Sequence, residues 1–157
     1  MHESFIVRLA VEKDFAEWLP LWSGYNQFYG RNGATALPQN ITRTTWSRFM
    51  DPKEPMHALV AQGPDGILGL AHFLYHRSTI QLGLSCYLQD LYTVEKARGR
   101  GVARALIQEV YRQAAEQGSP RVYWQTHESN VAAMKLYDKV AEKSGFVVYR
   151  KMIERLN

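Results

Sequence analysis

The sequence predicts an α/β fold, with one central sheet flanked by helices in a single domain that spans residues 1–157. Strand-like and helix-like stretches follow one another in the order β-α-α-β-β-β-α-β-α-β, without repeats or a linker. A buried strand at 85–94 leads through a glycine loop into a long amphipathic helix, and a strong hairpin turn lies at 63–66. With 157 residues and a hydrophobic content of 46%, the chain is large enough to bury one core.

The first half of the chain predicts three strands and two helices. Asp14 is placed to cap the first helix, and Pro20 is expected to bend or interrupt it. This helix carries an aromatic stripe that we expect to pack into the core, made of Phe15, Trp18, Trp22, Tyr25 and Phe28. The expected elements are a strand at 5–11, helices at 14–29 and 42–50, and hairpin strands at 56–62 and 67–77.

The second half predicts three more strands and two more helices. After the strand at 85–94, apolar residues recur every four positions in a helix of about four turns, at Val102, Leu106, Val110 and Ala114. A strand rich in β-branched and aromatic residues follows at 121–126. A further helix begins after Asn130 and is expected to close with Gly145 at its C′ position. Residues 146–153 predict the last strand.

The glycine loop before the long helix has the properties of a phosphate site. Gly99 and Gly101 allow the backbone to approach a ligand closely, because neither carries a Cβ atom. The helix start exposes unpaired amide N–H groups and the positive end of the helix dipole. Three arginines add positive charge that suits a phosphate or a nucleotide, namely Arg98, Arg100 and Arg104.

Two well-known phosphate loops do not match this stretch. A Walker loop needs Lys-Ser or Lys-Thr after its last glycine, and Gly101 is followed by Val102. A dinucleotide fingerprint needs glycine or alanine where this chain has Arg104, and an acidic strand end about twenty residues later. A glycine turn that merely reverses the chain remains the alternative.

The loop resembles the pyrophosphate-binding signature [QR]-x-x-G-x-[GA] of the GCN5-related N-acetyltransferases (GNAT), here with Arg98, Gly101 and Ala103. Its flanks are similar to the same family, since an L-x-D-L-Y-x-V strand precedes it and a long helix follows. The resemblance extends along nearly the whole chain. The stretch W-Q-T-H-E-S-N from Trp124 and the delayed G-F at Gly145 most resemble the subgroup that includes yeast histone and polyamine acetyltransferases.

This resemblance implies the GNAT fold and acetyl-CoA as cofactor. The fold would have a mixed, mostly antiparallel sheet of six to seven strands, flanked by about four helices and splayed between strands 4 and 5. The pantetheine arm of coenzyme A would lie in that splay, paired with the open strand edge. The implied cofactor-binding residues are Leu91, Tyr92, Thr93, Arg98, Gly99, Arg100, Gly101, Val102, Ala103, Arg104 and Asn130.

The resemblance also implies how the leaving thiolate is protonated. Leu136-Tyr137 matches the family's L-Y, so Tyr137 is the candidate catalytic acid, and a phenol is mostly protonated near neutrality. Asn130 precedes Tyr137 by two helical turns, about 10 Å, so both can face one groove. Packing of the Tyr137 ring alone and a plain N-cap role for Asn130 remain the alternatives. The oxyanion donor is expected to be the backbone N–H of Leu91 or Tyr92, where the family commonly has a β-bulge.

The catalytic base is the least defined group. Polyamine-acetylating relatives carry a glutamate where this chain has Gln89, and an amide cannot act as a base. The next residue, Asp90, is the candidate catalytic base. Glu128, a water chain and a purely structural Asp90 that accepts backbone N–H groups remain open.

The sequence therefore predicts an acetyl-CoA-dependent N-acetyltransferase that transfers acetyl directly, through a tetrahedral intermediate, to a primary amine. The acceptor class includes polyamines, amino acids and similar small molecules, or a basic protein tail. The first helices choose the acceptor, and their sequence does not define which it is. The alternative, motivated by Gln89, is a catalytically inactive acyl-CoA-binding regulatory domain.

Composition limits the cellular location and the partners that the sequence predicts. The lone cysteine, Cys86, excludes an internal disulfide and is typical of a cytoplasmic protein. The sequence shows neither the pattern of a leader nor an apolar stretch of membrane length, so we expect a protein that is neither exported nor inserted in a membrane. The net charge of +4 is scattered, so we do not expect nucleic acid as a partner. No metal site is expected, because His72 and His76 on one strand face would lie about 13 Å apart. From the family we expect a homodimer.

Overall fold

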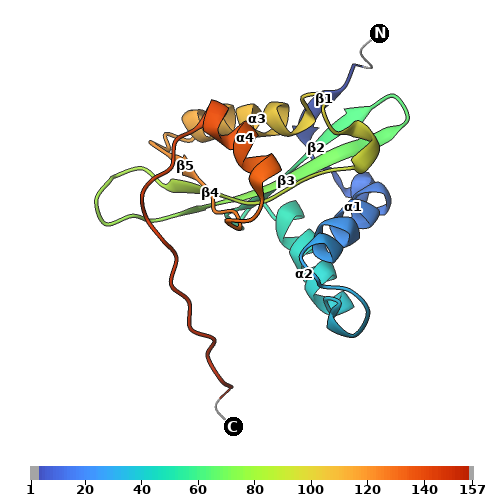
Figure 1. Cartoon of the computed structure of the whole chain (residues 1–157), viewed down its shortest axis with the longest axis horizontal. Helices are drawn as coiled ribbons and strands as arrows, with labels where there is room; N and C mark the ends of the chain where they lie inside the picture. Colours follow the sequence, from blue (N-terminus) through green and yellow to red (C-terminus); the bar gives the residue numbers. More distant parts are fainter. Residues whose placement is uncertain (1–3, 156–157) are drawn as a thin grey trace. The chain divides into compact units, whose positions relative to one another are not determined.

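A computed structural model describes residues 4–155 of the chain. Contacts divide the chain into two compact units, Met1–Gln125 and Thr126–Asn157. The first unit holds the sheet and three helices, and the second holds one helix (Figure 1). Within the described range, every helix is too short or too polar to cross a membrane. The prediction of a single domain stays a prediction.

The first unit is built on a five-stranded sheet in the order β1-β2-β3-β4-β5 (Figure 1). Neighbours pair antiparallel except β4 and β5, which are parallel. The mixed, mostly antiparallel sheet is confirmed, but five strands replace the six to seven expected. The strand predicted at 121–126 shrinks to two residues, because only these pair with β4. The bounds are β1 Ile6–Leu9, β2 Met56–Gly63, β3 Gly66–His76, β4 Ser85–Thr93 and β5 Val122–Tyr123.

Helices cover both faces of this sheet (Figure 1). Helix α3 (Val102–Glu116) lies on one face, and α1 (Phe15–Phe28) and α2 (Gln39–Met50) lie on the other. The predicted apolar face of α3 is confirmed, with Val102, Leu106, Val110 and Ala114 all buried. In β3, Gly69 lets α3 approach, because an added Cβ would stand only 2.9 Å from a methyl of Val102.

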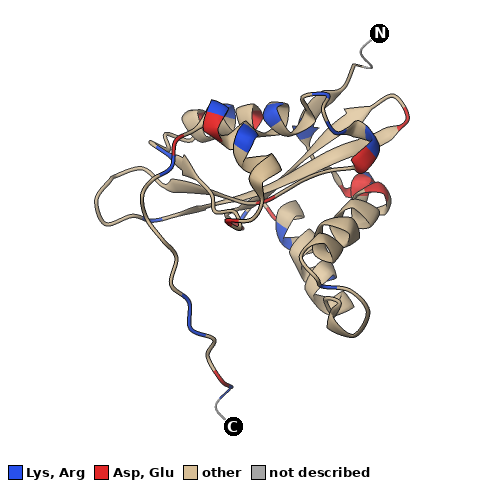
Figure 2. Ribbon diagram, viewed as in Figure 1, with Lys and Arg blue, Asp and Glu red and all other residues tan. Residues whose placement is uncertain are grey.

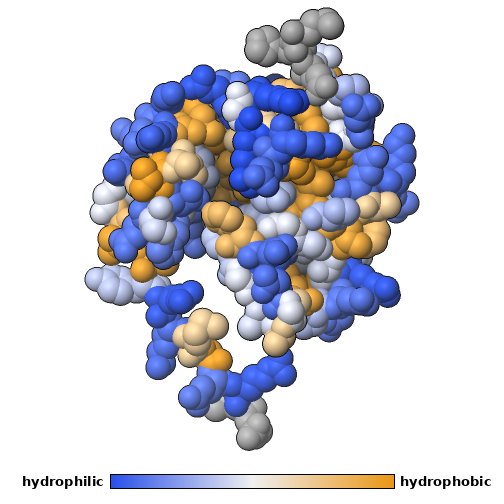
Figure 3. Space-filling view, turned by 45° about the vertical axis from the view of Figure 1, so that its right-hand side comes forward, coloured by the Kyte–Doolittle hydropathy of each residue, from blue (hydrophilic) through white to orange (hydrophobic). Residues whose placement is uncertain are grey.

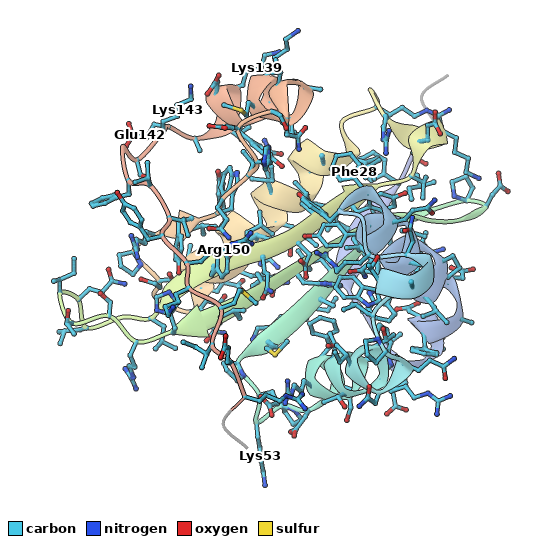
Figure 4. All side chains as sticks on the ribbon, turned by 60° about the horizontal axis from the view of Figure 1, so that its bottom comes forward. Phe28, Lys53, Lys139, Glu142, Lys143 and Arg150 are labelled. Atoms are coloured by element: carbon cyan, nitrogen blue, oxygen red, sulfur yellow. The ribbon has the colours of Figure 1, made fainter. Side chains whose placement is uncertain are left out.

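An aromatic cluster fills the space between α1, α2 and the sheet. Trp18 is fully buried, and its ring centre lies 5.7 Å from Trp22 and 4.8 Å from Trp46. Trp18, Trp22 and Tyr25 thus form core, as predicted for the stripe. Phe28 does not, since it is 63% exposed at the end of α1 (Figure 4). Figure 2 shows α1 almost free of charged residues beyond its first turn.

Two expectations for α1 need correction. Pro20 does not interrupt the helix, which continues to Phe28; Pro20 is exposed and removes only its own bond to the carbonyl four residues earlier. Asp14 precedes the helix, but its side chain does not cap it. The carboxylate instead accepts hydrogen bonds from the Arg8 guanidinium at 2.7 and 2.9 Å and from the Val11 N–H at 2.8 Å.

The second unit contains α4 (Val131–Val140) and an extended segment after it. Gly145 has a positive φ of 83° but does not close the helix, because Ala141 is already extended and donates the last helical hydrogen bond to Tyr137 O. The strand expected at 146–153 is not formed, and its apolar side chains are exposed. Hydrophobic side chains also reach the surface on the face drawn in Figure 3.

Candidate active site

β4 contains a bulge at Gln89. His72 of β3 pairs with Asp90 and Phe73 pairs with Leu88, so Gln89 has no partner on β3. Its side chain is exposed. The bulge thus lies slightly earlier than the expected position at Leu91 or Tyr92.

A hydrogen-bonded chain runs from the core to Asp90. The Trp18 Nε1–H donates to His72 Nε2 at 3.0 Å, so this nitrogen carries no proton. The proton of the neutral ring therefore lies on Nδ1, which donates to Asp90 Oδ2 at 2.9 Å. Because Trp18 and His72 are buried, this chain fixes the orientation of a carboxylate that is itself only 12% exposed.

Two phenols share the environment of Asp90. Burial raises the pKa of Tyr25, and the Asp90 carboxylate raises it further through its charge and a hydrogen bond. Burial and then the charge of Asp90 also raise the pKa of Tyr87. Both phenols therefore stay protonated and uncharged near neutral pH.

The outer edge of β4 is open beyond its short pairing with β5. Among residues 4–125, β5 pairs only with Cys86 and Tyr87. On the inner side, Val94 N–H donates to Leu68 O at 2.9 Å. Since amide direction alternates along an antiparallel strand, the N–H of Tyr92 points to β3 as well, and those of Leu91 and Thr93 point to the open edge.

The side chains of Tyr92 and Thr93 differ in their environment. Tyr92 packs against the aromatic cluster, and an added Cβ at Gly24 of α1 would stand 2.6 Å from its hydroxyl oxygen. Thr93 Oγ1 is buried and has no hydrogen-bond partner in the described structure. A buried hydroxyl without a partner suits a site where a ligand supplies one.

The loop after β4 presents backbone amides rather than side-chain caps. A short 3₁₀ turn (Glu95–Ala97) leads to Gly99 and Gly101, whose φ angles are +79° and +83°. The first bond of α3 runs from Ala105 N–H to Gly101 O, so the amides of residues 102–104 have no acceptor within the helix. The Arg98 Nε–H donates to Thr93 O at 3.3 Å, which ties the loop to the strand.

This loop and strand edge fit a coenzyme A molecule. The open space at both glycines, where an added Cβ would meet nothing within 4 Å, and the free amides suit a pyrophosphate. The outward amides of Leu91 and Thr93 suit an arm that contains amide groups. Predicted cofactor residues from Leu91 to Arg104 thus lie along one continuous path of strand, loop and helix start. Arg100 and Arg104 are exposed at this loop and helix start.

The two remaining predicted residues lie in the second unit. Tyr137 is half-buried in α4. Asn130 stands before α4, and its backbone O accepts from Met134 N–H at 3.1 Å, but its side chain makes no capping bond. The side-chain Nδ2 lies 3.4 Å from Thr126 Oγ1. The amide of Asn130 is therefore not used as a plain N-cap.

Sequence reasoning missed His72, Trp18 and Tyr25 as neighbours of Asp90. The sequence suggests His72 only as a metal ligand, and Trp18 and Tyr25 only as core residues. The available signal is a histidine within an apolar strand, followed along the chain by a second strand that contains an aspartate. This signal identifies Asp90 as the partner of His72 only when the register between β3 and β4 is known.

Comparison with known proteins identifies the family. The family model described as the acetyltransferase (GNAT) family matches residues 18–141. The D-amino-acid N-acetyltransferase HPA3 of Saccharomyces cerevisiae is 35% identical over 153 residues, covering 96% of this chain and 92% of that protein.

Solved structures share the fold. Aminoglycoside N-acetyltransferase AAC(6')-Iy in complex with CoA is similar with a TM-score of 0.81, at 15% identity and over 97% of both chains. A probable acetyltransferase gives a TM-score of 0.81 at 23% identity, over 96% of this chain and 99% of that one. The chain therefore belongs to the GNAT family and is an N-acetyltransferase that uses acetyl-CoA.

Proposed function

We propose that this enzyme acetylates the primary amine of a small molecule, with Asp90 as the catalytic base. The observation that carries the proposal is the position of the Asp90 carboxylate, which His72 orients at 2.9 Å beside the open edge of β4. The relative named as a D-amino-acid N-acetyltransferase supports amino acids as acceptors.

Asp90 would take the proton that the amine loses when its nitrogen attacks the acetyl carbon. One carboxylate oxygen, Oδ2, accepts a hydrogen bond from the His72 Nδ1–H, which holds the carboxylate in place. The carboxylate would then accept the proton from the amine, directly or through a bridging water. His72 acts as a positioning residue here. Gln89 has no part in proton transfer, because an amide is not a base.

Acetyl-CoA supplies an activated thioester when it is bound. Residues 102–104 and Arg98, Gly99, Arg100 and Gly101 would hold its pyrophosphate, chiefly through backbone amides. Thr93 N–H and Leu91 N–H, which point to the open edge, would hold the arm. Leu91 N–H is favoured over Tyr92 N–H as donor to the negative charge that develops on the carbonyl oxygen, since Tyr92 N–H points to β3.

Tyr137 would give its phenol proton to the sulfur as the carbon–sulfur bond breaks. Asn130 would bind the cofactor arm with its side-chain amide, which makes no capping bond. These two roles come from the match of Asn130 and Leu136-Tyr137 to the family pattern.

An acceptor screen tests the proposal. The protein is incubated with acetyl-CoA and a panel of D- and L-amino acids, polyamines, aminoglycosides and histone-tail peptides, and the free thiol of coenzyme A is followed. We expect thiol release with small primary amines. Tight coenzyme A binding with no release for any amine would instead identify a regulatory acyl-CoA-binding domain.

Three substitutions separate the roles. Asp90→Asn and Tyr137→Phe should each lower kcat by about 100-fold, the range of general acid–base catalysis, with little change in coenzyme A affinity. Gln89→Ala serves as the control, because Gln89 is exposed beside Asp90 and its truncation should leave kcat within about threefold. Equal losses for Gln89→Ala and Asp90→Asn would contradict Asp90 as the base.

The cellular location and the oligomeric state are also part of the proposal. We place the enzyme in the cytoplasm as a homodimer, supported by a free, buried Cys86 and by the common assembly of the family. Light scattering that gives the mass of a monomer would contradict the dimer.

A further inference from the structure

Arg31 lies just beyond α1, and in the described part of the chain both of its protein hydrogen bonds are to Asn26. Its Nε–H donates to Asn26 Oδ1 at 2.6 Å, and its backbone N–H donates to Asn26 O at 2.8 Å. Asn26 is only 4% exposed, and its own Nδ2 donates to Trp22 O at 2.8 Å. A buried amide therefore fixes the direction of the guanidinium.

The terminal nitrogens of Arg31 remain available. Its guanidinium carbon lies 5.8 Å from the ring centre of Tyr25 and 5.4 Å from that of Tyr29. Among residues 4–155, no carboxylate forms an ion pair with Arg31 and no protein acceptor binds its two terminal nitrogens. A half-buried arginine that is held at Nε and backed by two rings is prepared to bind a planar anion.

Asp90 and Arg31 both lie close enough to Tyr25 for their charges to affect its phenol. Tyr25 is buried, and the charges of Asp90 and Arg31 shift the pKa of its phenol in opposite directions. Tyr25 also stacks on Trp22, whose ring centre lies 5.2 Å from that of His72, the partner of Asp90. One negative and one positive group thus lie near the same aromatic side chain.

We propose that Arg31 binds the carboxylate of a free α-amino acid whose amine is directed to Asp90. An α-amino acid carries an amine and a carboxylate on one carbon, so it matches a fixed anion and a fixed cation that both lie near Tyr25. A bidentate pair between guanidinium and carboxylate supplies both affinity and orientation. This inference rests on the proposed function and makes Arg31 a specificity-determining residue.

The same charge pattern disfavours other acceptors. A polyamine presents a second ammonium group to Arg31, and like charges repel. A lysine within a protein tail brings no free α-carboxylate. Exposed Tyr29 and Phe28 at the end of α1 leave apolar surface beside Arg31 for an amino-acid side chain.

Three acceptors with one side chain test Arg31: D-phenylalanine, its amide, and phenylethylamine, each repeated with the L-form where one exists. For Arg31→Met we expect kcat/KM with phenylalanine to fall about 10- to 100-fold, the range of a charge-assisted hydrogen bond. The values for the amide and the amine should change less than about threefold. Arg31→Lys should retain part of the preference, and Arg48→Met, at an exposed arginine of α2, should change nothing.

Binding measurements keep the test independent of turnover. Isothermal titration of D-phenylalanine into wild-type protein and Arg31→Met, with coenzyme A present, should show loss of affinity in the variant. Equal losses for acid, amide and amine, or unchanged titration in Arg31→Met, would overturn the role of Arg31. Absence of acetylation for every amine, with binding still dependent on Arg31, would instead overturn the proposed function alone.

Discussion

Two glycines at opposite ends of α3 allow the phosphate role of the loop to be separated from helix stability. Gly101 before α3 and Gly118 after it have φ angles of +83° and +73°, and an added Cβ at either would meet nothing within 4 Å. Alanine at either position therefore costs the strain of a left-handed backbone, about 1–2 kcal/mol. For a chain of this length each kcal/mol lowers Tm by about 2–4 °C.

Only Gly101→Ala should change cofactor binding. The new methyl group is adjacent to residues 102–104, which present their amides, whereas Gly118 lies beyond the other end of a 15-residue helix that is about 22 Å long. We expect the Kd of coenzyme A to rise at least tenfold in Gly101→Ala, which is about 1.4 kcal/mol, and to stay unchanged in Gly118→Ala. Thermal melts and isothermal titration measure both quantities. Similar melts with equal coenzyme A affinity in the two variants would refute the role of the loop.

Three further predictions follow from buried groups. The hydrogen bond from Arg8 lowers the pKa of Asp14 in the folded protein. The ionised Asp14 carboxylate therefore stabilises the fold fully above the unfolded pKa of 3.8, and this stabilisation is lost as pH falls through the lower folded pKa. Urea denaturation should find Asp14→Asn about 2 kcal/mol less stable than wild type at pH 7 and nearly equal to it near pH 2. Burial raises the pKa of the Cys86 thiol to about 12, so less of the reactive thiolate is present in the folded protein. At pH 8, native protein should therefore react with thiol reagents about 1000-fold more slowly than unfolded protein, and equal rates would refute this. His72→Phe should lower kcat about tenfold without changing the Kd of coenzyme A, and an unchanged kcat would remove its positioning role.

The parts of the fold that were predicted correctly depend on local sequence. The four-residue period of α3, the glycines before it and the turn between β2 and β3 are each contained in a short stretch. Their geometry follows from periodicity and from the conformations that glycine allows. Burial of Trp18 and Trp22 was predicted for the same reason.

The parts that were missed depend on partners far away in the chain. Residues 146–153 have strand-forming side chains, but a strand needs an edge to pair with, and propensity does not supply one. The bond from His72 to Asp90 spans 18 residues and that from Trp18 to His72 spans 54. The bond from His72 to Asp90 depends on the register of β3 with β4, which the bulge shifts by one residue, and the bond from Trp18 depends on how α1 packs on β3.

That single extra residue also decides on which side of the sheet the carboxylate stands. His72 faces Trp18 of α1, whereas the adjacent Phe73 belongs to the opposite surface, and these two pair with Asp90 and Leu88 respectively. In a strand that kept Gln89 but lacked the bulge, residues two apart would share a face, so Asp90 would lie with Leu88 on the α3 side, away from Tyr25 and His72. At this point of the strand, the number of residues matters more than their identity.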